Sequence, residues 1–202
     1  MRWFDSQEEA LVQFIRTPGF LYELRRCAAA FALLIPLGFV LGLAFPEVRD
    51  ALLGQLLVQP EDAASYSAMD ALNSALTACG MSILCGVIPF AYLPALSLGS
   101  NALLIGAMAV WYPAHGHSLA LYLSAVLPHG VFLLPAMVLC CAAGMYLCGE
   151  ITRRCRGDKS GPPLLQTASQ IGGVYLLLAF PVLCAAALME VHVTPRLMSL
   201  FL

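Results

Sequence analysis

Long apolar stretches separated by short polar ones make up most of the chain. Residues 71–149 contain no Asp, Glu, Lys or Arg, and residues 27–45 and 171–189 are two further uncharged runs of 19 residues. A helix of about 20 apolar residues crosses a bilayer, because a backbone in lipid must bond its own amides and carbonyls. The first and last runs therefore predict one transmembrane helix each.

The uncharged middle of the chain predicts three more crossings. Residues 71–112 are about twice as long as one crossing needs, so we expect two helices joined by a turn. The turn-forming residues of this stretch are Pro94, Ser97, Gly99, Ser100 and Asn101.

Residues 118–149 are too long for one crossing and too short for two with a turn. Pro128-His129-Gly130 lies in the middle of this stretch. Proline lacks an amide donor and disfavours helix at the residue before it. The pattern predicts a half-helix over 119–127, a break, and a full span over about 131–149.

The first 26 residues predict a helix lying on the inner membrane surface. Ser6-Gln7-Glu8-Glu9 is a capping box, apolar residues follow at helical spacing, and Thr17-Pro18-Gly19 predicts a bend. A partner-binding arm or a solvated tail is the alternative. The predicted fold is an all-α, polytopic membrane bundle of about five spans. Its parts are an interfacial helix (1–26), the transmembrane bundle (27–190) and a C-terminal tail (191–202).

Composition and charge agree with a membrane protein and set its orientation. Hydrophobic residues make up 60% of the chain and charged residues 11%, whereas soluble proteins carry about 25% charge. The net charge of −2 argues against nucleic-acid binding. Eight of the ten basic residues flank the first span or lie in residues 150–170, which predicts a cytoplasmic N-terminus and an extracytoplasmic C-terminus.

The sequence carries no familiar signature of catalysis. It has no H-E-x-x-H motif, P-loop or paired intramembrane aspartates, so we expect neither an enzyme nor a cofactor. The eight cysteines form no C-x-x-C pair and are expected at helix contacts as small apolar residues. His115 and His117 are two residues apart and have the right chemistry for a metal, but a site needs three or four ligands. We therefore expect no metal there.

Small and amide residues within the spans suggest helix contacts. Gly38 and Gly42 form a G-x-x-x-G pattern, which is typical of close helix packing. Asn73 and Asn101 are costly in lipid unless bonded, so they are expected to bond between helices or to line a path for a substrate or ion.

His129 is the sharpest candidate. An ionisable ring within an uncharged span is by default a functional hypothesis. The alternative is structural, with the ring bonding a carbonyl that the break leaves free. No Asp or Glu lies within the same span to form a proton relay with it.

Residues 127–137, with Pro128, His129, Gly130 and Pro135, followed by the small-residue stretch 142–147, resemble the stage II sporulation protein M family. Asn73, Asn101 and Gly106 resemble further parts of its pattern. The chain departs from the pattern at Leu133, where the family has Glu, and at Ala102, where it has Gly.

The resemblance implies a multi-pass protein of the bacterial cytoplasmic membrane that organises or recruits partners and is not an enzyme. The partner expected on this reading is a cell-wall enzyme. The alternative is a dimeric permease or channel subunit similar in layout to the membrane half of an ABC-2 exporter, working with a cytoplasmic ATPase. That second likeness is one of architecture alone. Either way, we expect a homo-oligomer in a lipid bilayer.

Overall fold

The structure, a computed structural model, describes residues 11–57, 67–158 and 160–201, and every regular element in those ranges is a helix. Five helical stretches are long and apolar enough to cross a membrane. They are α2 (Pro18–Ala44), α4 with the 3₁₀ turn η1 (Ala68–Val87), α5 (Leu93–Ala114), α6 (Leu119–Cys155) and a run from Leu164 to His192. The predicted all-α bundle with five spans is confirmed, and the protein is a membrane protein.

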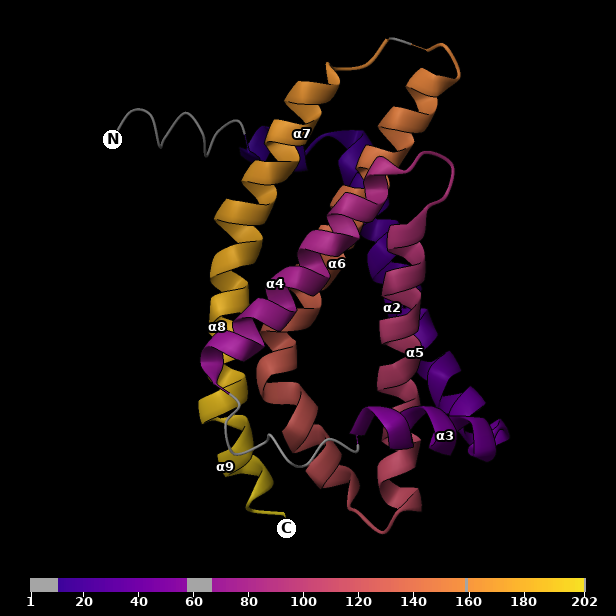
Figure 1. Ribbon diagram of the computed structural model, residues 1–202, viewed down its shortest axis with the longest axis vertical. Coiled ribbons are helices and arrows are strands. Elements are labelled where there is room, and N and C mark those ends of the chain that lie inside the picture. The colour runs from indigo at the N-terminus through magenta and orange to yellow at the C-terminus, as the bar shows by residue number, and fades with distance from the viewer. Residues whose placement is uncertain (1–10, 58–66, 159, 202) are drawn as a thin grey trace.

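Helix α6 forms the centre of the bundle. It packs against α2, α4, α5 and α8, and Figure 1 shows it passing between α8 and the α2–α5 pair. Of its most apolar stretch 61% is buried, against 22–33% in the other four spans. Small side chains allow this packing, because Cys140, Cys141, Ala142 and Ala143 are fully buried at its middle.

The predicted break in the fourth span is wrong. Residues 119–127 are not a separate half-helix, because α6 continues through both Pro128 and Pro135 and only bends (Figure 1). Each proline removes one backbone bond. A full break would leave several more amides and carbonyls unpaired in apolar surroundings, which costs more than a bend.

The predicted turn between the second and third spans is displaced toward the N-terminus. The chain turns at residues 88–92, where Phe90 and Tyr92 have positive φ values of 65° and 47°. Pro94 lies in the first turn of α5, where its missing amide costs nothing. Gly99 and Asn101, expected in the turn, lie inside the helix.

The N-terminal prediction is tested only in part, since the capping box lies outside the described residues. Residues 11–15 are helical, and the chain bends at residues 16–17 before α2 begins at Pro18. The proposed boundary at residue 27 therefore falls within one helix. Leu11 and Phe14 are buried against α6 and the last span.

The remaining elements lie at the ends of the spans. The segment between the first and second spans contains α3 (Pro46–Leu57), which lies across α2 and α5 in Figure 1. The last span consists of α7 (Leu164–Gly173), a π-helical segment η2 (Val174–Ala179) and α8 (Phe180–His192). The π segment widens the helix just before Pro181, which has no amide to donate. The short helix α9 (Thr194–Met198) packs on α6 and α8.

Candidate functional site

The four motif residues of α6 lie in different surroundings. Gly130 is buried, Pro128 and His129 are half-buried, and Pro135 is exposed. His129 Nδ1 is buried and has no hydrogen-bond partner in the part of the chain that the structure describes. The expected structural role, a bond from the ring to a freed carbonyl, is therefore not formed through Nδ1.

Gly38, Gly42 and Gly106 lie together in one seam between α2 and α5. A β-carbon at Gly38 would lie 2.7 Å from Leu103 Cα, and one at Gly106 would lie 2.6 Å from the Phe39 nitrogen. Gly42 faces Ala107 in the same way, at 3.3 Å. The two helices run parallel and touch through their backbones, so the G-x-x-x-G pattern of α2 serves a contact within the chain.

A second close contact joins η1 to α6. A β-carbon at Gly86 would lie 2.7 Å from the carbonyl carbon of Gly144, and one at Gly144 would lie 2.9 Å from Pro94 Cγ. Beside this contact, Ser82 Oγ donates to Ala78 O at 3.0 Å and lies 3.3 Å from Ser97 Oγ. These polar groups of the bundle bond one another or the backbone, which is the arrangement expected of structural contacts.

The amide and outer histidine candidates do not form a common site. Asn101 Nδ2 donates to Ser97 O of its own helix at 2.8 Å rather than across helices, and Asn73 is exposed. His115 stacks on Trp111 with ring centroids 4.2 Å apart, and His117 is exposed. Among the described residues no group of three His, Cys, Asp or Glu side chains could hold a metal ion, and all eight cysteines are free.

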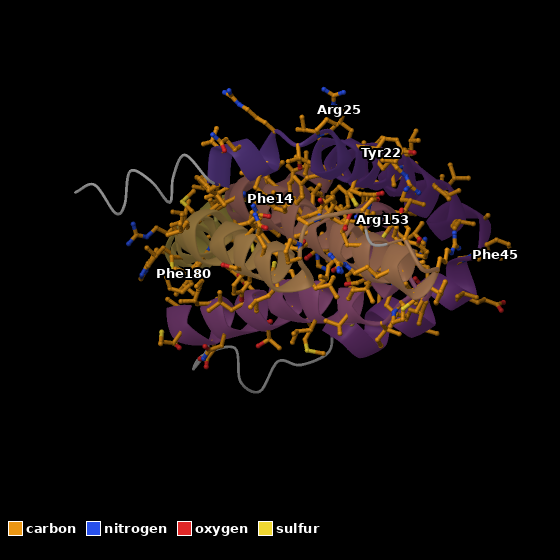
Figure 2. All side chains as sticks on the ribbon, turned by 90° about the horizontal axis from the view of Figure 1, so that it is seen from above. Phe14, Tyr22, Arg25, Phe45, Arg153 and Phe180 are labelled. Carbon is orange, nitrogen blue, oxygen red and sulfur yellow. The ribbon has the colours of Figure 1, made fainter. Side chains whose placement is uncertain are left out.

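Charged residues gather at one end of the bundle, which we call the basic end. It consists of the start of α2, the turn at residues 88–92 and the end of α6 with the loop that follows. Its described charged residues are Arg16, Glu23, Arg25, Arg26, Glu150, Arg153, Arg154, Arg156 and Asp158. Arg25 points away from the ribbon in Figure 2, and Arg26 pairs with Glu23 at 3.2 Å.

Two arginines fold the loop after α6 back onto the helix. Arg153 Nη2 donates to Glu150 Oε2 at 2.5 Å and Nη1 donates to Ser160 Oγ at 3.3 Å. Arg154 Nη2 donates to the carbonyl oxygens of Gly161 and Pro162. The loop is therefore held at several points rather than by one contact.

The same loop contains an internal carboxylate bond. Ser160 donates to Asp158 Oδ1 through its hydroxyl at 2.6 Å and its backbone amide at 2.9 Å. These bonds hold the pKa of the Asp158 carboxyl below its ordinary value. The carboxylate consequently stays ionised and bonded at neutral pH.

The turn between α4 and α5 supports the last turns of α6. The backbone amide of Phe90 donates to Thr152 Oγ1 at 3.0 Å, and the guanidinium of Arg156 lies 5.6 Å from the centre of the Phe90 ring. Backbone with positive φ at Phe90 is strained for a non-glycine residue, and these contacts hold it. Together, the loop and the turn give the basic end a defined shape.

Sequence reasoning missed three residues of this architecture. Arg49, which was not singled out from the sequence, is 9% exposed on α3. Thr152 and Phe90 meet across 62 residues of sequence, and no local pattern indicated that bond. No local pattern singled out Arg49, because the acidic residues Glu47 and Asp50 lie on either side of it.

The comparisons with known proteins agree with the resemblance found in the sequence. A family model described as stage II sporulation protein M matches residues 27–195, which contain most of every span. No curated protein and no solved structure matches the chain. The predicted family is therefore confirmed.

Proposed function

Since the chain belongs to the stage II sporulation protein M family, we propose that it is a non-enzymatic subunit that holds partner proteins together at the bacterial cytoplasmic membrane. The observation that carries the proposal is the basic end, a folded and charged surface beyond the apolar part of the spans. It supplies a docking surface, and within the described ranges no group of three His, Cys, Asp or Glu side chains could hold a metal ion.

The length of α6 supports a surface that projects from the bilayer. Its 37 residues span about 55 Å at 1.5 Å per residue, whereas the hydrocarbon core is about 30 Å thick. Charges are costly in hydrocarbon, so the turns from Glu150 onward lie outside it. By the positive-inside rule this end faces the cytoplasm. A cytoplasmic partner with an acidic surface fits it by charge.

The packing of the bundle favours this role over that of a permease. The middle of α6 is buried, the contact at Gly144 brings its backbone against the end of α4, and the contact at Gly106 brings the backbones of α5 and α2 together. A permease needs a path that opens along such seams, and moving these contacts apart would lose tight packing. The dimeric permease with an ATPase partner remains the alternative outcome of the test.

The test is purification of the protein from native membranes, followed by mass spectrometry of what is bound. One variant carries Arg25→Gln, Arg26→Gln and Arg156→Gln, which lower the charge of the basic end without touching Arg153 or Arg154. Arg196→Gln on α9, at the opposite end, is the matched control. We expect partners to be retained by the wild type and the control, and lost by the triple variant in a salt-sensitive manner.

Two results would contradict the proposal. Equal partner recovery from the triple variant would exclude the basic end as the docking surface. A co-purifying ATPase, together with ATP-dependent movement of a substrate in vesicles, would establish the permease instead.

A further inference from the structure

An apolar groove lies on α2 and α5, on the side that α3 crosses. Its volume is about 620 Å³, and its walls include Leu41, Phe45, Val48, Leu52 and Ser100. The first four are exposed apolar side chains. Figure 2 shows Phe45 at the edge of the molecule. The groove does not involve the basic end, so it is independent of the proposed function.

The groove exists because the seam beneath it is built from small residues. Gly38 and Gly42 let α2 approach α5 through backbone atoms, and no side chain from these two positions fills the space above the seam. Helix α3 crosses the two helices (Figure 1), and its residues Val48, Arg49 and Leu52 form part of the wall of the groove. The result is an apolar groove along two membrane helices, bordered by α3.

Arg49 places a cation in this apolar lining. The residue is 9% exposed. Among the described residues that line the groove, Arg49 is the one that carries a charge. Its Nη1 donates to Gly42 O at 3.2 Å, and its Nε donates to Asp50 Oδ1 at 2.7 Å. A guanidinium has five N–H donors, of which these bonds use two. The Asp50 side chain is 42% exposed, so it partners Arg49 from the rim rather than from within.

We propose that the groove binds an anionic phospholipid, with an acyl chain along the α2–α5 seam and the phosphate against Arg49. Arginine binds phosphate through paired N–H groups, and such charge-assisted bonds are strongest where water is scarce. A buried cation in the wall of an apolar groove matches a ligand with an anionic head and a hydrocarbon tail. Asp50 is the competitor that the phosphate replaces.

The groove has the size and lining of a small-ligand site. Such sites have volumes of about 300–1,000 Å³, are mostly apolar and carry few placed polar groups. One acyl chain and one phosphate fit this description, with Arg49 as the placed polar group.

The test is native mass spectrometry of the purified protein, titrated with equal amounts of phosphatidylglycerol and phosphatidylcholine. We expect one phosphatidylglycerol to be retained preferentially by the wild type. Arg49→Gln should weaken that binding about tenfold, because it removes the charge-assisted bond to phosphate. Ser100→Phe should reduce the binding of both lipids by filling the groove.

Three variants control for folding and for general effects of charge or size. Arg25→Gln removes an exposed cation at the basic end, and Ser74→Phe adds a ring at an exposed position of α4; both should bind as the wild type does. Asp50→Asn removes the competing carboxylate and should strengthen phosphatidylglycerol binding several-fold. This opposite direction cannot arise from a fold that is merely weakened.

Phosphatidylglycerol binding that is equal in the wild type, Arg49→Gln and Ser100→Phe would overturn the proposal. So would a photo-crosslinker at Ser100 that captures a second polypeptide in native membranes in place of lipid. Because lipid retention is measured on the purified protein, its outcome does not depend on whether partners bind the basic end.

Discussion

Gly106 of α5 lies directly against the backbone of Phe39 of α2, so that a β-carbon at Gly106 would be 2.6 Å from the Phe39 nitrogen. The two residues are 67 positions apart in sequence, yet their contact sets the distance between two spans. The glycine is required there because any side chain would force the backbones apart.

Gly106→Ala should therefore lower the free energy of unfolding by about 1–3 kcal/mol, the usual cost of overpacking a close contact. Gly149→Ala is the control, because nothing lies within 4 Å of a β-carbon at that position of α6. The control should be neutral or stabilising, by up to about 1 kcal/mol. Thermal unfolding in detergent measures both. An equal response of the two variants would contradict the backbone contact.

The two glycines of α6 should respond differently to the same change. Gly144→Ala should destabilise the protein, since its β-carbon would meet the backbone of Ser82 and lie 2.9 Å from Pro94 Cγ. Gly130→Ala should be tolerated, because its nearest neighbours are 3.7 Å away, an ordinary contact. Thermal unfolding of the two variants in the same detergent tests whether their stabilities differ in this way. A severe loss of stability in Gly130→Ala would contradict the ordinary contact distances around this glycine.

His129→Leu should leave stability unchanged or slightly raised. The ring nitrogen Nδ1 is buried without a partner in the described part of the chain, so replacing the ring with an apolar group removes an unmet bond. Thermal stability and partner recovery from membranes should both be measured for this variant. Lost recovery with full stability assigns His129 a functional role. A loss of more than about 1 kcal/mol of stability would show that the ring forms a structural bond.

Arg154→Gln should loosen the loop that follows α6. The side chain bonds the carbonyls of Gly161 and Pro162, and the chain's single lysine, Lys159, is a unique cleavage site beside them. Cleavage after lysine should become about fivefold faster, which corresponds to the loss of about 1 kcal/mol of bonding. Arg25→Gln is the control and should be cleaved at the wild-type rate. Unchanged cleavage in Arg154→Gln would mean that these bonds do not hold the loop.

The number of spans was predictable because lipid imposes a simple demand. A run such as residues 27–45 must bond its own backbone, so apolar length alone indicates a crossing. Local structure that depends on tertiary neighbours was not predictable in the same way. Pro128 and Pro94 are the same residue type, yet Pro128 bends a continuous helix while Pro94 begins one. Whether a proline bends a helix or begins one depends on the tertiary surroundings of the neighbouring backbone carbonyls.

In the candidate sites, too, local patterns were predictable and tertiary partners were not. Gly38 and Gly42 were recognisable as packing residues from their spacing, but their partner, α5, was not. Arg49 was not recognisable as a buried residue, because nothing in the local pattern predicts that α3 turns it toward Gly42. Asn101 was expected to join helices, whereas an acceptor four residues earlier in its own helix was available.

The central claim, that the spans carry the basic end and α9 to opposite faces of a membrane, is tested most directly by cysteine labelling. Cys155 is exposed at the end of α6, and Ser199 is exposed just after α9, with one crossing between them. In intact spheroplasts a membrane-impermeant maleimide should label Ser199→Cys in a Cys155→Ser background and leave native Cys155 unlabelled. Inverted vesicles should give the reverse. Labelling of both positions from the same face would contradict the account.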